Sequence, residues 1–114
     1  MPGFEPGDVV KVPFSYTDAR TTARRPALVL ASAGPAENSG LLVWALMITS
    51  AENRGWPDEV PVDDLALAGL PAPSVVRCAK IATLDAARAE PLGRLSPDTL
   101  DAVRVRVGAI LLMA

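Results

Sequence analysis

The sequence predicts a single mainly β domain over residues 1–114, built as a small β-barrel or curled sheet with one C-terminal helix. Short runs rich in Val, Leu and Ile recur along the chain and are separated by segments rich in Pro, Gly and Asn. Helical spacing of apolar residues is found near the C-terminus. A chain of 114 residues fits one domain with one modest core. Several strands followed by one helix favour a sheet or barrel with the helix packed against it.

The N-terminal third predicts two strands joined by a polar loop. Residues 8–14 (DVVKVPF) have the Val and Phe content of a strand. Residues 15–23 (SYTDARTTA) hold few strand formers and predict an exposed loop, where binding residues are commonly found. A second strand is expected over residues 27–31 (ALVLA). Pro26 cannot donate a backbone hydrogen bond, so we expect it at a strand start or an edge.

The middle of the chain predicts a buried third strand. Residues 32–40 are a cluster of turn residues, and residues 41–50 (LLVWALMITS) are apolar on both faces. A strand of that kind is covered by the core on one side and by a second layer or a subunit on the other. Residues 51–57 predict another loop.

Shorter elements are expected after this loop. Residues 58–62 predict a short strand, and residues 63–69 (DDLALAG) predict a single helical turn. Residues 74–81 (SVVRCAKI) predict a strand that residues 82–85 either continue or pair with, and residues 92–95 predict a further short strand.

The C-terminal segment predicts a helix with a clear beginning. Ser96 is a good N-cap, Pro97 suits the first helical position, and Asp98 suits the positive end of the helix dipole. Apolar residues then recur at helical spacing: Leu100, Val103, Val107, Ile110 and Met113 with Ala114.

The charge balance argues against a generally basic nucleic-acid coat protein but leaves room for a local basic patch. The net charge is −2, and nine of the 11 basic residues are Arg, the exceptions being Lys11 and Lys80. The planar guanidinium matches phosphate geometry, so the bias suits phosphate recognition. An Ala-, Arg- and Pro-rich proteome would give the same bias, and composition alone does not separate the two readings.

Histidine is absent, which removes the commonest general base and the commonest metal ligand. We therefore expect no metal and no cofactor. The single cysteine, Cys78, lies in an apolar run and is expected to pack as a small hydrophobic residue. With no secretory signal and no run of about 18 apolar residues, we expect a cytoplasmic protein that does not enter the membrane.

The groups that remain for chemistry are Arg, Lys and hydroxyl side chains beside loops. Arg25 lies between the polar loop and the second strand, and Thr49 and Ser50 end the third strand. Strand ends converge in a small barrel, so a guanidinium and a hydroxyl can hold one phosphate while an RNA 2′-OH attacks it. The alternative is a surface arginine before a proline and a strand-terminal threonine with a capped hydroxyl.

Five segments occur in an order that resembles the MazF/PemK-like toxins over nearly the whole chain: GDVVKVPFSYTD, RRPALVLAS, LMITSAE, SVVRCAKIATLD and LGRLSPDTLDAV. The resemblance implies an SH3-like barrel of the kind shared with the gyrase poison CcdB. It also implies a toxin of a type II toxin–antitoxin system that is an endoribonuclease and a homodimer, with a cognate antitoxin that shares its DNA binding.

The resemblance assigns the catalytic roles. The Arg before Pro26 is the family's catalytic arginine, and the Thr of I-T-S is its second catalytic residue, so Arg25 and Thr49 take these roles. Arg25 would take part in proton transfer and stabilise the phosphorane; since arginine is a poor base, the charge role is favoured. Thr49 would donate a hydrogen bond to a non-bridging phosphate oxygen, assisted by Ser50. The implied products are a 2′,3′-cyclic phosphate and a 5′-OH end, formed without metal.

Further residues are expected to bind single-stranded RNA. Lys80 is expected near phosphate or base, with a solvated strand lysine as the alternative, and Arg24 and Arg20 are expected to steer RNA. Trp56 is placed to stack on a base or to cover the barrel. The loop TDARTTA lacks the Gly and Glu of many members, and Asp18 is its only acid. The proton-transfer partner and the cut sequence therefore stay open.

Two other functions are compatible with the same fold. One is a non-catalytic poison that binds DNA gyrase in the manner of CcdB, although the apolar C-terminal ILLMA lacks a polar tip. The other is a catalytically inactive binding dimer. For the leading interpretation, we expect the antitoxin to be a short acidic chain whose apolar segment lies across the groove and covers Arg25.

Overall fold

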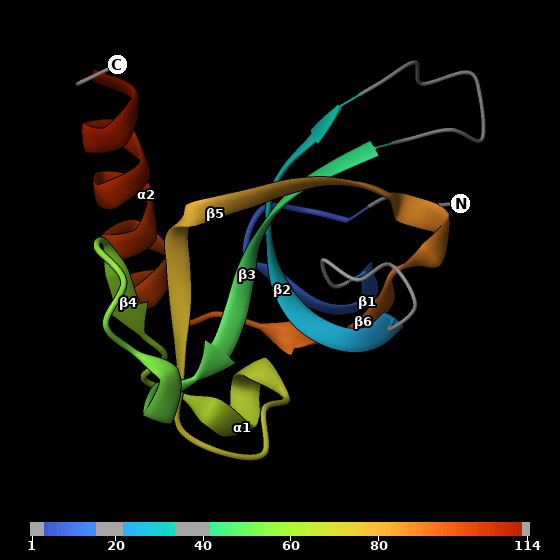
Figure 1. Ribbon diagram of the computed structural model, residues 1–114, viewed down its shortest axis with the longest axis horizontal. Helices are drawn as coiled ribbons and strands as arrows, with labels where there is room; N and C mark the ends of the chain where they lie inside the picture. The colour runs from blue at the N-terminus through green and yellow to red at the C-terminus, as the bar shows by residue number, and fades with distance from the viewer. Residues whose placement is uncertain (1–3, 16–21, 34–41, 113–114) are drawn as a thin grey trace.

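The computed structural model describes residues 4–15, 22–33 and 42–112. These residues form a six-stranded antiparallel sheet in the order β4-β5-β3-β2-β1-β6 (Figure 1). The strands are β1 (Asp8–Ser15), β2 (Thr22–Ala33), β3 (Leu42–Ser50), β4 (Glu59–Pro61), β5 (Ser74–Asp85) and β6 (Glu90–Arg94). The helices are α1 (Leu65–Ala68) and α2 (Pro97–Leu112), and the 3₁₀ turns are η1 (Ala51–Asn53) and η2 (Ala86–Arg88).

The predicted mainly β fold with a C-terminal helix is confirmed. The long strands coil strongly, so that the sheet curls around its own axis (Figure 1). Apolar residues alternate between the two faces, and each face carries its own buried cluster. Val9, Leu28 and Leu46 belong to the cluster on the α2 side, whereas Val10 and Ala27 belong to the cluster on the other face.

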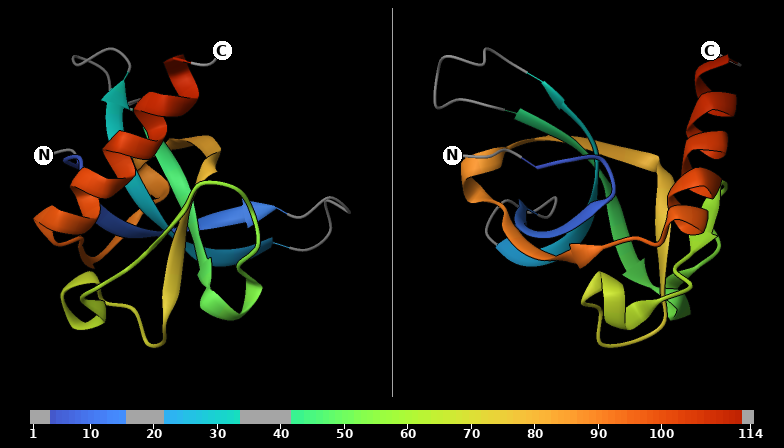
Figure 2. Two further views of the ribbon diagram at one scale, coloured as in Figure 1. Left: turned by 90° about the vertical axis from the view of Figure 1, so that its left-hand side faces the viewer. Right: turned by 180° about the vertical axis from the view of Figure 1, so that it is seen from behind.

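Helix α2 begins as predicted and packs on one side of the sheet. The Ser96 hydroxyl accepts a hydrogen bond from the backbone N–H of Thr99 at 3.2 Å, which is the N-cap bond. Val103 is fully buried, and Leu100, Val107 and Ile110 pack against the same cluster. Figure 2 shows α2 lying against β4 and β5. No helix among the described residues is long and apolar enough to cross a membrane.

Strand β2 is longer than predicted. It begins at Thr22, so the last two residues of the predicted loop are strand; residues 16–21, like the turn residues 34–41, lie outside the described part. Pro26 is not at the strand start, since it pairs with Lys11 of β1 inside the ladder. It does lie one residue before the first β2–β3 pair, Ala27–Met47. The missing N–H is tolerated there because β2 does not pair with β3 at Pro26, so no ladder hydrogen bond to β3 is lost.

Strand β3 is buried on both faces only in its central part. Ala45 to Ile48 are all buried, whereas Trp44 is 46% exposed and Leu42 is 37% exposed. The burial predicted on the second face is thus incomplete within one chain. A second layer or subunit was the expected cover for such residues.

Strand β5 is one continuous strand, so residues 82–85 continue the strand predicted from residue 74. Its pairing with β3 is irregular: Leu46 faces Ile81, but Ile48 faces Val76. The residues between these pairs, 77–80, bulge out of the β3 ladder, and Arg77 pairs instead with Glu59 of β4. Bulges of this kind turn side chains in new directions. Arg77 and Lys80, at the two ends of this bulge, line the same hollow as Thr49 at the end of β3.

Two further predictions are confirmed: the helical turn within residues 63–69 and the packing of Cys78. The predicted helical turn is α1, capped by the Asp64 side chain and ended by Gly69 in the left-handed conformation. Cys78 is 5% exposed and packs in the α2-side cluster. Burial raises the pKa of its thiol to about 11, as expected for a packing cysteine.

Candidate active site

Arg25 and Thr49 come together at the end of the β2–β3 ladder. The ladder's last pair is Ala27 with Met47, and both of these residues are buried on the same face. Arg25 and Thr49 lie two residues further along their strands, so the alternation of side chains sends them to that same face. The two side chains expected to share a phosphate therefore emerge side by side.

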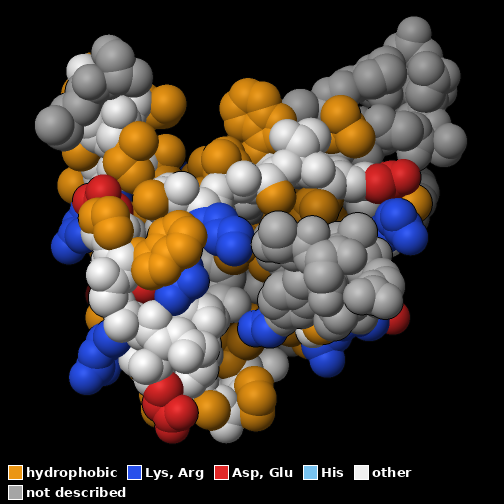
Figure 3. Space-filling view, in the orientation of Figure 1, with side chains coloured by type: hydrophobic (Ala, Val, Ile, Leu, Met, Phe, Trp, Pro, Cys, Tyr) orange, Lys and Arg blue, Asp and Glu red, His pale blue; other side chains and the backbone are white. Residues whose placement is uncertain are grey.

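The first depression at this point is the basic hollow, with a volume of about 410 Å³. Three of its lining side chains are cationic, from β2 and the β5 bulge, and none is acidic. Figure 3 shows basic and large hydrophobic side chains next to each other near the centre of this face. The lining consists of Arg25, Met47, Ile48, Thr49, Asn53, Arg77 and Lys80.

A second depression, the proline hollow, adjoins the first and has a volume of about 310 Å³. It is lined by Lys11 and Arg24, by Ser50, and by the apolar segment between α1 and β5 that contains Pro71 and Pro73. Arg25, Ile48 and Thr49 line both hollows. Arg25 and Thr49 thus stand on the boundary of two neighbouring depressions. An extended ligand that crosses from one depression to the other would be held on both sides of this pair.

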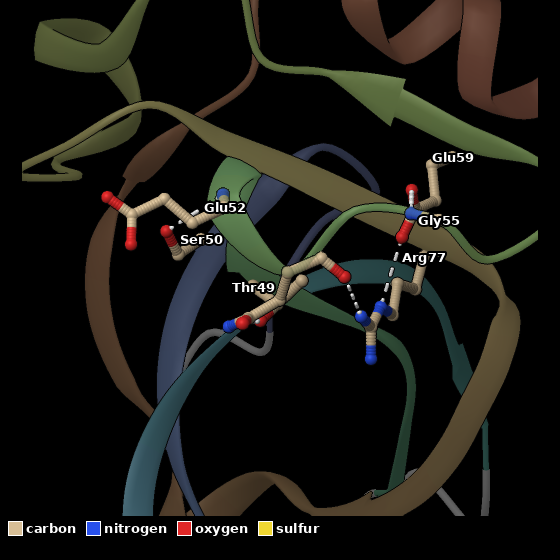
Figure 4. A network of polar contacts seen from close by, with 7 residues as sticks. Thr49, Ser50, Glu52, Gly55, Glu59 and Arg77 are labelled. Atoms are coloured by element: carbon tan, nitrogen blue, oxygen red, sulfur yellow. Dashed lines mark hydrogen bonds and ion pairs between the residues drawn. The ribbon is translucent and has the colours of Figure 1, made fainter.

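The Thr49 hydroxyl is oriented by the η1 turn that follows it. The Asn53 side-chain amide donates a hydrogen bond to Thr49 Oγ1 at 3.3 Å. The turn itself is capped by Ser50, whose hydroxyl accepts from the backbone N–H of Glu52 at 3.2 Å (Figure 4). A hydroxyl that accepts one bond still has its hydrogen to donate. Thr49 can therefore donate to an oxygen in either hollow.

Arg77 connects β4, β5 and the η1 turn beneath the basic hollow. Its Nε donates to Glu59 Oε2 at 3.1 Å, and its Nη2 donates to the Asn53 backbone oxygen at 2.6 Å (Figure 4). The other Glu59 oxygen accepts from the backbone N–H of Gly55 at 2.8 Å. The bond from Gly55, followed by the hydrogen bond and charge of Arg77, lowers the pKa of Glu59, so this acid remains ionised in the site.

Trp56 stands over the same group. Its ring centroid is 4.4 Å from the Arg77 guanidinium carbon and 5.6 Å from Lys80 Nζ, which are cation–π distances. The residue is 44% exposed. Trp56 therefore covers Arg77 and still presents ring surface to solvent at the edge of the basic hollow.

The structure brings most of the predicted site residues to one place. Lys80 lines the basic hollow, and Ser50 and Arg24 line the proline hollow. Arg24 is also paired with Glu90 at 2.8 Å and donates to the Lys11 backbone oxygen. The remaining two predicted binding residues, Asp18 and Arg20, lie outside the described residues.

Asn53 and Arg77 were not singled out by the sequence for this site. Arg77 precedes Cys78 in β5, and its side chain lines the basic hollow, whereas Cys78 packs in the α2-side cluster on the other face. Asn53 follows Thr49 by four residues, within a segment predicted as loop. The signal that could have identified Asn53 is its position in a short turn directly after β3, which brings its side chain back to Thr49.

The lining suits an anionic ligand with oxygen acceptors. Guanidinium, ammonium, amide and hydroxyl groups all donate to phosphate oxygens, and the positive charge of the hollow repels a free divalent cation. Within the described ranges, no group of three or more Cys, Asp or Glu residues is placed to hold a metal ion. A phosphodiester is the ligand that this set of donors fits best.

Comparisons with known proteins give a consistent picture. Residues 5–111 match the family model described as PemK-like, MazF-like toxin of type II toxin–antitoxin system. No curated protein sequence matches the chain.

Several solved structures share the fold. The chain is similar to a MazE–MazF structure from Deinococcus radiodurans, with 31% identity, 100% coverage of both chains and a TM-score of 0.69. It is also similar to the toxin MazF-mt6 of Mycobacterium tuberculosis, with 26% identity over 94% of this chain and 96% of the other and a TM-score of 0.63. An endoribonuclease from Mycobacterial species in complex with its cognate antitoxin has a TM-score of 0.70 at 19% identity, covering 100% of this chain and 98% of that one.

Proposed function

Since the chain belongs to the PemK-like, MazF-like toxins of type II toxin–antitoxin systems, a family of endoribonucleases, we propose that it cuts single-stranded RNA at the boundary of its two hollows. The observation that carries the proposal is the placement of Arg25 and Thr49, which emerge together from adjacent strands and line both hollows. Residues 1–114 would form the single toxin domain that does this.

The proposed reaction uses the nucleophile that RNA itself carries. The 2′-oxygen loses its proton and attacks the adjacent phosphorus, the bond from phosphorus to the 5′-oxygen breaks, and the leaving 5′-oxygen gains a proton. Arg25 stabilises the charge that builds up on the phosphorane, because arginine keeps its charge and offers a planar set of donors. Thr49 donates to a non-bridging oxygen. The products are a 2′,3′-cyclic phosphate and a 5′-OH end.

The two hollows suggest how the RNA is held on either side of the scissile phosphate. On one side lie Lys80 and the Trp56 ring, a cation and a stacking surface for an unpaired base. On the other side lie Arg24 and Ser50 beside apolar proline-rich walls. Asp18 and Arg20 are proposed to complete the groove from the polar loop between β1 and β2.

We propose that cutting needs no metal ion and no cofactor. The cationic side chains of the basic hollow already supply the positive charge that a metal would bring to a phosphate. The site holds no histidine, since the chain has none. Alignment of the 2′-OH and stabilisation of charge are therefore the contributions assigned to the protein.

The proposed partners are a cognate antitoxin and a second copy of the chain. A short acidic antitoxin with an apolar segment fits a groove that is basic on one side and proline-lined on the other. A homodimer would cover apolar side chains that one chain leaves exposed, among them Trp44 at 46% and Ile81 at 54%. Both partners and the cytoplasm as the site of action follow from the proposed toxin role.

The test is the cleavage of a mixed RNA in excess EDTA by the wild type, Arg25→Ala and Thr49→Ala. We expect cutting by the wild type and a loss of about 10²-fold in each variant, as for removal of one donor to a developing anion. Intact RNA with the wild type, or equal cutting by the variants, would contradict the proposal. Inhibition of DNA gyrase without RNA turnover would instead support the gyrase-binding alternative.

A further inference from the structure

We infer that Glu59 and Arg77 are positioning residues for this reaction, acting through Asn53 to hold the Thr49 hydroxyl toward the scissile phosphate. We call Glu59, Arg77 and Asn53 the brace. The inference rests on the proposed function, because it assigns a role in the same cleavage step. It goes further by connecting a carboxylate outside both hollows to the rate at which RNA is cut.

The first contact of the brace is the one between Asn53 and Thr49. The amide donates to Thr49 Oγ1, so this oxygen accepts on one side and its hydrogen is directed elsewhere. Without Asn53, the hydroxyl of the partly exposed Thr49 can rotate among its staggered positions. The bond from Asn53 therefore selects the rotamer in which Thr49 donates into the hollows.

The second contact fixes Asn53 itself. Asn53 ends the η1 turn, and its backbone oxygen accepts from Arg77 Nη2 at the short distance of 2.6 Å. This bond ties the turn to β5, which is anchored in the sheet on both sides by β3 and β4. Movement of the Arg77 guanidinium would therefore be transmitted directly to the residue that orients Thr49.

The third contact fixes Arg77. Glu59 accepts from Arg77 Nε and from the Gly55 backbone N–H, so one carboxylate holds both the guanidinium and the segment that follows η1. The side chains of Arg77 and Glu59 are only 14% and 10% exposed, which limits competition from water. Trp56 lies over the guanidinium on the remaining side. The position of Thr49 is thus linked to Glu59 through three hydrogen bonds in series.

Glu59 offers a test that separates positioning from charge. It does not line either hollow, and its negative charge near a basic groove opposes RNA binding. Glu59→Gln keeps the size of the side chain and an oxygen for Gly55, but it places an amide N–H₂ against the Arg77 donor. If only charge mattered, this change would improve RNA binding; the brace predicts slower cutting instead.

The experiment measures kcat and KM for cleavage of one RNA in EDTA by the wild type, Glu59→Gln and Glu52→Gln. Glu52 is an exposed acid on the same turn, so its variant removes the same charge without touching the brace. We expect Glu59→Gln to lower kcat about 10-fold or more, as small displacements of a reacting group do, with KM unchanged or lower. Glu52→Gln should keep the wild-type kcat.

The second arm repeats Glu59→Gln in the Thr49→Ala background and adds Asn53→Ala. If the brace acts through Thr49, Glu59→Gln has no further effect on kcat once the hydroxyl is gone. Asn53 is exposed and its backbone contact survives the change, so Asn53→Ala tests the final bond even if Glu59→Gln weakens folding. Asn53→Ala should lower kcat as Glu59→Gln does.

The possible results are distinct. The brace is supported if Glu59→Gln and Asn53→Ala each lower kcat and if Glu59→Gln causes no further loss of kcat in the Thr49→Ala background. A wild-type kcat in Asn53→Ala overturns the brace and leaves the proposed function standing. The same holds if Glu59→Gln lowers kcat equally with and without the Thr49 hydroxyl. No cutting by the wild type overturns the proposed function and this inference together.

Discussion

Arg25 of β2 and Thr49 of β3 each lie two residues beyond the last pair of the β2–β3 ladder, on the same face of the sheet. Both line the basic hollow and the proline hollow, and they are accompanied there by Ile48. The relationship depends on the backbone rather than on flexible side chains, because it is set by strand register. Two groups held in this way are already placed for a shared ligand before it binds.

This placement predicts that Arg25→Lys will cut RNA slowly. Lysine keeps the positive charge, but its ammonium is a point donor that cannot match two phosphate oxygens as the guanidinium fork does. We expect kcat to fall by about 10-fold or more with a smaller change in KM, measured by single-substrate cleavage kinetics. A variant that retains the wild-type kcat would show that the charge of Arg25 suffices and that its geometry does not matter.

A close approach between α1 and β6 predicts a strong effect at Gly93. A Cβ on Gly93 would lie 2.6 Å from the Ala68 carbonyl carbon and against the backbone oxygen of Leu67, neither of which can move aside easily. Gly93→Ala should lower the free energy of unfolding by about 1–3 kcal/mol, measured by urea denaturation.

Gly108 provides the matched comparison for this substitution. A Cβ there would meet nothing within 4 Å, and the residue lies inside α2. Gly108→Ala should therefore raise the free energy of unfolding by about 0.5–1 kcal/mol, because alanine loses less backbone freedom in a helix. Equal effects of the two alanines would contradict the close packing of β6 on α1.

How far the sequence predicts this molecule depends on how local each feature is. Strand runs of Val, Leu and Ile, and the Ser96 cap of α2, are local, and the structure confirms them. The meeting of Arg25 with Thr49 required only that neighbouring strands end together. Arg77 could not be assigned in this way, because its contact with Asn53 joins residues 24 apart and Arg77 lies where β5 bulges out of its ladder with β3.

Asp63 predicts a dependence of stability on pH. Its carboxylate accepts from the hydroxyls of Thr99 and Ser96, each at 2.7 Å, and these bonds, that of Thr99 first, lower its pKa below the ordinary value of 3.8. An acid with a lowered pKa in the folded state stabilises the fold above its ordinary pKa. This stabilisation is lost as the pH falls through the lowered value.

The expected measurement is the melting temperature of the wild type, Asp63→Asn and the exposed control Asp101→Asn over a range of pH. At neutral pH, Asp63→Asn should melt below the wild type, and the difference should shrink below about pH 4 as the wild-type carboxylate gains its proton. Asp101→Asn should follow the wild type. A difference that stays constant down to pH 2 would show that Asp63 does not act through its charge.

Cys78 predicts a thiol that is unreactive in the folded protein. Burial raises its pKa to about 11, so at pH 8 only about a thousandth of the thiol is in the reactive thiolate form. Iodoacetamide should modify the protein slowly in buffer and rapidly in concentrated urea, as followed by mass spectrometry. Equally fast modification in both conditions would mean that the α2-side cluster opens readily.

The central claim is that Arg25 and Thr49 hold one phosphate while the neighbouring 2′-OH attacks it. The most direct measurement compares an RNA that the protein cuts at one known position with the same RNA carrying a single 2′-deoxynucleotide on the 5′ side of that position. The account predicts that this one change abolishes the cut in EDTA while binding persists, and that the unmodified RNA yields a 2′,3′-cyclic phosphate and a 5′-OH end. Continued cutting of the deoxy-substituted RNA, or products with 5′-phosphate ends, would contradict it.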